Sequence, residues 1–446
     1  MGNAEHQGLI GRRPLADGLV LRTATPEDAA ELAEFNAVMQ AEDDLPGDLV
    51  HEWTLELFES PPPRFRAEDD IVVVEDTATG RIVSSVLLIP QDWSYAGVVI
   101  PVGQPELVAT DPAYRRRGLI REQFAEIHRR SEAVGDLWQV IGGIPWYYRQ
   151  FGYAYALDLP PVPVWRPPAK VPDSPAEIAL RAATLADLPF LARVDAHGLR
   201  DGLGCVRDEA AWRYELTHRP GSLSGRDLLV VERSTAAGRD PIGFVAHTSM
   251  LRYGSASIWA FELAPGESWL APTAAVLVHL DAWARSHPDG PGGGVRLLVP
   301  DGHPARRSAA TGLTGGRPGG YGFYIRMTDP ARALTTVRTV LEDRLARSPA
   351  VGHTGEVVID LYTGTLRFGF EEGRLEAVTA DGPRPDDAPP ADVRLPAEWL
   401  LHLALGNRSL GELQATVADC LVETDSGALV LDALFPRMPL FPWTMG

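Results

Sequence analysis

The 446-residue sequence predicts a mixed α/β protein with an α+β carboxyl-terminal region. Three observations predict this class. A strand, a turn, a helix and a second strand follow one another over residues 107–141. A segment near the amino terminus recurs about one domain length later, and a last region alternates short strands with helices. The length suits two to four domains. We place them at residues 18–158, 176–328 and 329–446.

The β–α–β unit has clear sequence signals. An apolar strand over 107–110 leads into a turn, and an amphipathic helix begins at Gly118. Ile120, Phe124 and Ile127 recur at helical spacing, and Gly135 is a suitable stop. A second apolar strand covers 137–141. Two strands joined by a helix predict a right-handed parallel crossover.

The repeat predicts two related domains in tandem. Residues 19–28 and 178–187 each combine a short strand, a Thr at a helix start and an acidic first turn. A proline-rich stretch over 159–175 separates the copies and predicts an extended connector. Residues 288–320 are rich in Pro and Gly, and we predict a flexible loop there. The third region predicts strands over 357–362, 365–370 and 375–378 and a helix over 397–405.

The helix that begins at Gly118 predicts an anion site. The first turn of a helix presents unpaired N–H groups and a partial positive charge. Glycine allows close approach of a ligand to the backbone, and Arg115, Arg116 and Arg117 precede Gly118 directly. This pattern is typical of a polyanion site such as a pyrophosphate site. A run of arginines can also be a solvated face.

Composition narrows the function classes. Net charge is −19, which disfavours nucleic acid and anionic membrane partners and favours a small cationic amine or a basic peptide. The 2 cysteines form neither a disulfide framework nor a zinc motif, so we expect no metal. We see no signal peptide or membrane-spanning run and expect a cytoplasmic protein. A Gly-x-Ser-x-Gly element is absent, which argues against a hydrolase.

The segment 107–121 resembles the coenzyme A motif of GNAT-family N-acetyltransferases. Arg115-x-x-Gly118 after a Val-Ala-Thr strand carries the likeness, although Ile120 stands where that motif has a small residue. The triple arginine followed by Gly-Leu-Ile is closer to the enhanced-intracellular-survival (Eis) branch. The resemblance implies two tandem GNAT folds and a carboxyl-terminal sterol-carrier-like (SCP2-like) domain. It also implies a homo-oligomer, expected to be a hexamer.

The resemblance implies acetyl-CoA as cosubstrate and assigns residues to it. Backbone groups of the strand would line the pantetheine arm, and an N–H there could polarise the thioester carbonyl. The helix start would bind the pyrophosphate, and a loop after the next strand would make a further contact. The residues expected to contact the cofactor are Val108, Ala109, Thr110, Arg116, Arg117, Gly118, Leu119, Ile120, Arg121, Gly143 and Ile144. In the second copy, residues 264–270 contain no arginine and include Glu267, so we expect that copy to lack the site.

The resemblance also assigns proton transfers. Tyr148 precedes Phe151-Gly-Tyr153 as the family's proton donor does, and a phenol there can protonate the leaving thiolate. The alternative is an aromatic core residue. Eis-like enzymes are thought to use the terminal carboxylate as base, here that of Gly446, with a water relay as the alternative.

Asp43 and Trp53 match positions that line the amine cleft of the family. An acid with an aromatic face suits a cationic amine, although a solvated loop and a core tryptophan are equally compatible. We therefore expect an acetyl-CoA-dependent N-acetyltransferase acting on aminoglycosides, polyamines or lysine by direct attack. Two alternatives remain open: a related enzyme with a longer acyl or aminoacyl donor, and a non-catalytic protein that binds coenzyme A or lipid.

Overall fold

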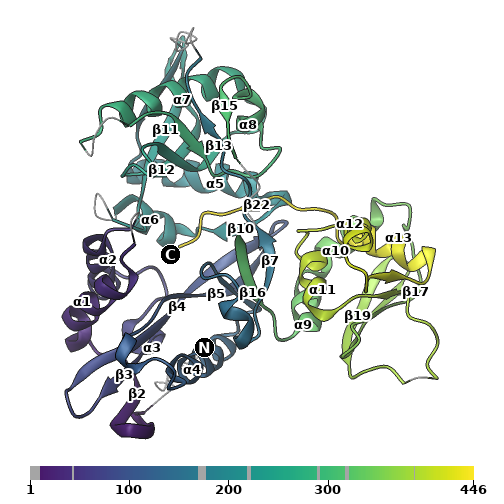
Figure 1. Ribbon diagram of the computed structural model, residues 1–446. Helices are drawn as coiled ribbons and strands as arrows, with labels where there is room; N and C mark the ends of the chain where they lie inside the picture. Colours follow the sequence, from purple (N-terminus) through teal and green to yellow (C-terminus); the bar gives the residue numbers. More distant parts are fainter. Residues whose placement is uncertain are drawn as a thin grey trace, which may run out of the picture.

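The computed structural model describes residues 11–445 apart from 43–44, 169–176, 218–221, 289–291, 317–320 and 386. Figure 1 shows three lobes, each built around its own sheet. Strands and helices mix in every lobe, so the predicted α/β class is confirmed. No helix among the described residues combines the length and the apolar character needed to cross a lipid bilayer.

The first sheet has the order β1-β2-β3-β4-β5-β6-β16-β7, with β10 and β22 joined at one end of β4. Its strands are β1 (Arg13–Pro14), β2 (Leu19–Thr23), β3 (Ile71–Asp76), β4 (Arg81–Tyr95), β5 (Val98–Thr110), β6 (Trp138–Ile141), β7 (Ala154–Asp158), β10 (Leu203–Val206), β16 (Gly322–Arg326) and β22 (Leu440–Phe441). Its helices are α1 (Ala29–Gln40), α2 (Gly47–Glu59), α3 (Ala67–Asp70) and α4 (Leu119–Val134). The predicted strand, helix and strand over 107–141 are confirmed as β5, α4 and β6, with Gly135 at the carboxyl end of α4.

The second sheet has the order β15-β8-β14-β13-β12-β11-β9. Its strands are β8 (Val164–Trp165), β9 (Ile178–Ala182), β11 (Arg226–Thr235), β12 (Gly238–Thr248), β13 (Ala256–Leu263), β14 (Val295–Leu297) and β15 (Leu313–Thr314). Its helices are α5 (Leu188–Gly198), α6 (Glu209–Thr217), α7 (Leu270–Arg285) and α8 (Pro304–Ser308). The prediction of a flexible loop over 288–320 is wrong for residues 292–316. β14 pairs there with β13, β15 pairs with β8, and α8 lies between β14 and β15 in the chain.

The third sheet has the order β19-β18-β17-β20-β21. Its strands are β17 (Gly355–Asp360), β18 (Thr365–Glu371), β19 (Arg374–Asp381), β20 (Val393–Arg394) and β21 (Leu421–Val422). Its helices are α9 (Pro330–Thr336), α10 (Arg338–Ala346), α11 (Ala397–Ala404), α12 (Leu410–Thr416) and α13 (Asp425–Leu434). The predicted strands and the helix ended by Gly406 therefore form, with the glycine in the left-handed region at φ 66°.

The predicted repeat corresponds to one structural device used twice. In each copy an arginine of the first strand pairs with an aspartate of the helix start and with a glutamate of the neighbouring strand. The same Asp accepts a hydrogen bond from the backbone of a Thr, which forms a capping box. The two sets are Arg22, Thr25, Asp28 and Glu75, and Arg181, Thr184, Asp187 and Glu232.

Strands cross between the lobes. β10 pairs antiparallel with β4, and β16 lies between β6 and β7, although both fall within the predicted 176–328 range. β8, from the predicted connector, pairs with β14 and β15 of the second sheet. Sheet membership thus does not follow the predicted boundaries. The division into three domains stays a prediction.

Residues 435–445, which we name the strap, leave the third lobe after α13 and run between the other two lobes (Figure 1). Within the strap, β22 pairs parallel with β10. Trp443 is buried and meets Trp212 edge to face, with ring centroids 5.9 Å apart. The strap therefore brings the end of the described chain close to the first sheet.

Candidate active site

The first sheet divides at β5 and β6. These strands pair in parallel at Val102 with Trp138 and at Gly103 with Gln139, and no later pair forms between their described residues. On its other side, β5 contains a bulge, because Ser85 faces Ala109 whereas Leu87 faces Glu106. Leu107 takes the left-handed φ of 47°. A bulge leaves backbone groups outside the ladder; the Leu107 N–H bonds the Glu106 carboxyl, and the next N–H, that of Val108, becomes available to a ligand.

The predicted strand contacts lie at this division. The Val108 carbonyl accepts a hydrogen bond of 3.2 Å from Gln40. Ala109 is buried, and the Thr110 hydroxyl lies 2.8 Å from that of Ser84. The surrounding side chains thus hold the end of β5 in place, and its backbone lines the space between the strands.

The loop before α4 forms a backbone nest. Arg116 has φ 66° and Gly118, the N-cap of α4, has φ 77°. Successive N–H groups in left-handed and helical geometry converge on one point, where an anion can bind. A side chain at Gly118 would meet no atom within 4 Å, so the nest opens to solvent. Leu119 and Ile120 turn into the apolar cluster beneath it, which explains why a bulky residue fits at 120.

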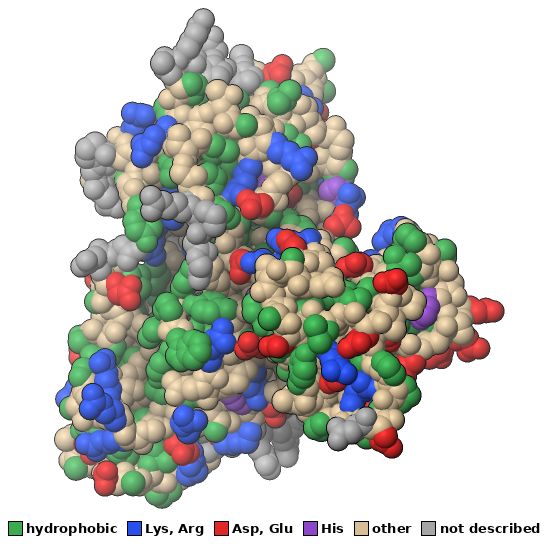
Figure 2. Space-filling model, turned by 45° about the vertical axis from the view of Figure 1, so that its right-hand side comes forward, with side chains coloured by type: hydrophobic (Ala, Val, Ile, Leu, Met, Phe, Trp, Pro, Cys, Tyr) green, Lys and Arg blue, Asp and Glu red, His purple; other side chains and the backbone are tan. Residues whose placement is uncertain are grey.

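Arginines surround this nest. Arg117 lies 4.9 Å from the Tyr114 ring centroid and 3.9 Å from an Asp17 carboxylate oxygen. Arg121 lies over Phe151 at 5.7 Å, and Arg116 is exposed. On the face shown in Figure 2, acidic side chains gather on the third lobe at the right, whereas blue basic side chains are frequent on the first lobe at the lower left. The acidic net charge therefore does not prevent a local anion site, and the nest fits a pyrophosphate.

Tyrosines hold the loop after β6. Gly143 has φ 137°, and a Cβ there would lie 2.9 Å from the Tyr148 ring, so glycine is required for two reasons. Tyr155 donates to the Gly143 carbonyl at 3.5 Å, and Tyr324 donates to the Ile144 carbonyl at 3.3 Å. Ile144 itself is 61% exposed.

Tyr148 lies in the short 3-10 helix η4 (Tyr147–Phe151) and is buried. Its ring packs edge to face against Tyr324, with centroids 5.5 Å apart. Burial raises the pKa of its phenol above the ordinary value, and negative charge on Glu106 raises it further. Tyr148 therefore keeps its proton at neutral pH, as a proton donor must. Its contact with Gly143 places it beside the loop predicted to contact the cofactor.

A cavity of about 190 Å³ lies between the first and second lobes. β5, β16, the second lobe and the strap all contribute to its wall, through residues that include Gln104, Glu106, Trp259, Tyr321, Phe323 and Thr444. Burial raises the pKa of Glu106 to about 7, although a hydrogen bond of 2.7 Å from Gln104 lowers it. A carboxyl that titrates near neutral pH suits a general base.

Glu106 was not among the site residues predicted from the sequence. A single acid within an otherwise apolar and neutral strand over 98–110 was the available signal. Trp53, predicted to line the amine cleft, is instead buried in the core within α2 and does not line this cavity. Asp43 and Gly446 lie outside the described residues, so their predicted roles stay predictions.

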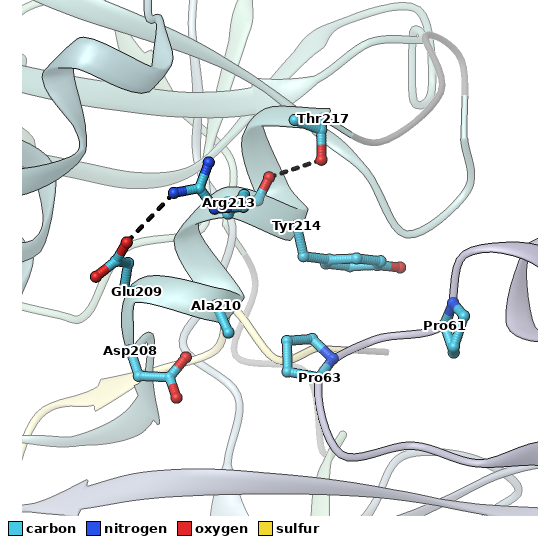
Figure 3. Close-up of a pocket in the computed structure, with 8 residues that line it drawn as sticks. All are labelled: Pro61, Pro63, Asp208, Glu209, Ala210, Arg213, Tyr214 and Thr217. Carbon is cyan, nitrogen blue, oxygen red and sulfur yellow. Dashed lines mark hydrogen bonds and ion pairs between the residues drawn. The ribbon is translucent and has the colours of Figure 1, made fainter.

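A second and wider cavity, of about 690 Å³, lies between α6 and the loop after α2 (Figure 3). Tyr214 points into it, with Pro61 and Pro63 on the opposite wall. Arg213 there is paired with Glu209 at 3.2 Å. Glu106 lines the smaller cavity and not this one, so we assign the chemistry to the smaller one. Among the described residues, no group of three or more His, Cys, Asp or Glu could hold a metal ion.

Comparisons with known proteins agree with this geometry. The family model described as "Acetyltransferase (GNAT) domain" matches residues 21–156. The N-acetyltransferase Eis of Mycobacterium tuberculosis (strain ATCC 25177 / H37Ra) is 38% identical over 98 residues, which is 20% of this chain and 24% of that protein. The match has the same extent for the protein of that name from Mycobacterium bovis (strain BCG / Pasteur 1173P2). The matched segment thus spans about a quarter of the length of these relatives.

Solved structures resemble the whole chain. A GCN5-related N-acetyltransferase from Kribbella flavida superposes with a TM-score of 0.62 at 15% identity, covering 95% of this chain and 98% of that one. One from Anabaena variabilis ATCC 29413 gives 0.61 at 15% identity, covering 95% and 100%. Eis1 from Mycobacterium abscessus gives 0.55 at 14% identity, covering 95% and 99%. The chain therefore contains a GNAT acetyltransferase domain at residues 21–156, within a mixed α/β fold that GNAT structures share along most of its length.

Proposed function

We propose that the protein is an N-acetyltransferase that moves the acetyl group of acetyl-CoA to a primary amine by direct attack. One observation carries the proposal. The nest at the start of α4, the phenol of Tyr148 and the carboxyl of Glu106 lie along one division of the sheet, between β5 and β6. Acetyl-CoA would supply the activated acetyl thioester.

The chain's own residues bind and orient the reactants in this proposal. Backbone N–H groups at Gly118, Leu119 and Ile120, with Arg116 and Arg117 beside them, hold the pyrophosphate. Backbone groups from Val108 to Thr110 hold the pantetheine arm, and an N–H freed by the β5 bulge polarises the carbonyl. This stabilisation acts where negative charge develops on the carbonyl oxygen.

Two side chains move protons. As the C–N bond forms and the C–S bond breaks, Glu106 accepts a proton from the amine nitrogen and Tyr148 donates its proton to the sulfur. Burial favours the protonated form of the Tyr148 phenol. The pKa of about 7 gives Glu106 a large ionised fraction at neutral pH. The carboxylate of Gly446 stays a second candidate for the base.

The cavity walls support a cationic amine as acceptor. Glu106 supplies negative charge, and Trp259, Tyr321 and Phe323 supply aromatic surface. An ammonium group is attracted to both features. We propose aminoglycosides, polyamines and lysine side chains as the acceptor classes to test.

The test is release of free thiol from acetyl-CoA with a panel of aminoglycosides, polyamines and lysine-containing peptides. We expect Tyr148→Phe to lower kcat by about 10²–10⁴ while acetyl-CoA still binds in calorimetry. Tyr147→Phe, at the neighbouring position, is the matched control and should retain most activity.

A second set of assays uses longer acyl-CoA and aminoacyl donors. A preference for one of them would show that acetyl-CoA is not the natural donor. Binding of acetyl-CoA without thiol release across the whole panel would instead favour the non-catalytic alternative. No heat from acetyl-CoA would remove the proposal altogether.

A further inference from the structure

A directed chain of hydrogen bonds joins the strap to Glu106. The Met445 backbone N–H donates to Gln91 Oε1 at 3.3 Å. Gln91 Nε2 donates to Gln104 Oε1 at 2.7 Å, and Gln104 Nε2 donates to Glu106 Oε1 at 2.7 Å. Gln91 is 3% and Gln104 2% exposed, so both amides are shielded from water. The last described residue of the strap is thus connected to the carboxyl in the cavity.

This chain has one direction because of amide chemistry. A glutamine donates through its NH₂ group and accepts through its carbonyl. Gln104 and Glu106 lie two residues apart on one face of β5, and Gln91 faces Val102 on β4, so all three side chains share that face. The strap N–H orients Gln91, Gln91 orients Gln104, and Gln104 presents a donor to the carboxylate. Consecutive hydrogen bonds of this kind polarise one another.

The strap itself is firmly held at its inner end. The Arg207 guanidinium lies 3.3 Å from the Trp443 ring centroid and donates to the carbonyls of Trp443 and Thr444 at 3.4 Å. The Leu203 N–H donates to the Pro439 carbonyl at 2.9 Å. The Met445 N–H is therefore fixed relative to β4 and does not depend on a free chain end.

We propose that Gln91 and Gln104 are positioning residues through which the docked strap orients the Glu106 carboxyl and stabilises its ionised form. The inference rests on the proposed function, in which Glu106 is the base. Two phenols also face this carboxyl: Tyr148 from η4, whose pKa responds to Glu106, and Tyr321, which precedes β16 and does the same. Because both are neutral, the cost of ionising Glu106 is offset by hydrogen bonds, first from Gln104 and then from the Leu107 backbone N–H.

The experiment measures the titration of Glu106 in the full-length protein. Gln104→Leu removes the direct donor. Gln91→Leu removes the donor that holds the Gln104 carbonyl, so the Gln104 amide loses the orientation that presents its NH₂ group to Glu106. We expect each variant to raise the midpoint of the acidic limb of kcat/KM by about one pH unit. The same midpoint is read by ¹³C NMR of labelled glutamate carboxyls, with Glu106→Gln identifying the signal.

Two comparisons make the result specific. The double variant should shift the midpoint by less than the sum of the single shifts, because both act through one amide. Gln123→Leu removes another buried glutamine, whose Nε2 donates to the Val72 carbonyl, and should leave the midpoint unchanged. An unchanged midpoint in Gln91→Leu, or additive shifts, would overturn the inference. The NMR titration needs no turnover, so it judges this inference even if no acetyl transfer is found.

Discussion

The starts of α4 and α7 occupy corresponding places in the first and second lobes, yet only α4 begins in a nest. The N-cap of α4 is Gly118 in left-handed conformation, and Arg116, two residues before it, is also left-handed. The N-cap of α7 is Trp269 in right-handed conformation, and Glu267 before it pairs with Arg233 at 2.6 Å. A few loop residues thus decide whether the same architecture forms a backbone nest or an ion pair at the helix start.

The strands before these helices differ in the same sense. Glu106 on β5 faces a cavity, whereas Glu262 on β13 lies 3.2 Å from His303 in a closed environment. A Cβ on Gly198 would come within 2.5 Å of the Glu262 side chain, so there is no space for a ligand. Glu262 is therefore enclosed by packing in the second lobe, whereas Glu106 of the first lobe borders a cavity.

The largest expected effect compares the two carboxyls. Glu106→Gln should lower kcat for acetyl transfer by about 10²–10⁴, because it removes the base. Glu262→Gln should retain the wild-type rate while it costs about 1–3 kcal/mol of unfolding free energy through the His303 contact. Steady-state kinetics with the best amine and urea denaturation measure both. Full activity of Glu106→Gln would return the role of base to Gly446, which an added two-residue extension would then test.

The next effect compares two glycines with left-handed φ. Gly118→Val should weaken acetyl-CoA binding by on the order of tenfold or more, because a branched side chain distorts the nest. Gly266→Val, at φ 87° before α7, imposes similar strain and should leave binding unchanged. Calorimetric titration with acetyl-CoA measures the difference. Equal losses of affinity in both variants would mean that the second lobe also takes part in acetyl-CoA binding.

A third comparison uses the repeated arginine–aspartate pairs. The Arg22 side chain is 11% exposed and the Arg181 side chain 39%. Breaking the more buried pair should cost more, so we expect Asp28→Asn to lose about 3 kcal/mol and Asp187→Asn about 1 kcal/mol. Hydrogen bonds from Arg181 lower the pKa of Asp187 to about 2, so its stabilisation is present above about pH 4 and is lost as the pH falls toward 2. Urea midpoints at pH 7 and pH 3 test both statements.

The smallest effect concerns stability against pH. Burial raises the pKa of Glu106 to about 7, so the neutral carboxyl favours the folded state. This contribution is complete below about pH 4 and is lost as the pH rises through 7. Glu106→Gln should reduce the loss of unfolding free energy between pH 5 and pH 8 by on the order of 1 kcal/mol. An identical pH dependence in the two proteins would show that Glu106 titrates near its ordinary value.

Local signals in the sequence determined the β5–α4–β6 unit, the helix start at Gly118 and the repeated strand and capped helix start over 19–28 and 178–187. Periodicity, capping residues and glycine positions act over a few residues, so a single chain segment contains the information. The predicted roles of Asp43 in amine binding and of Gly446 as base stay predictions. Tertiary structure alone decided that Glu106 lies close enough to Tyr148 to raise its pKa, that Trp53 is core and that β16 enters the first sheet. It also joined Met445 to Gln91. These features depend on contacts between residues far apart in sequence, and their free energies come from burial and pairing that no local pattern encodes.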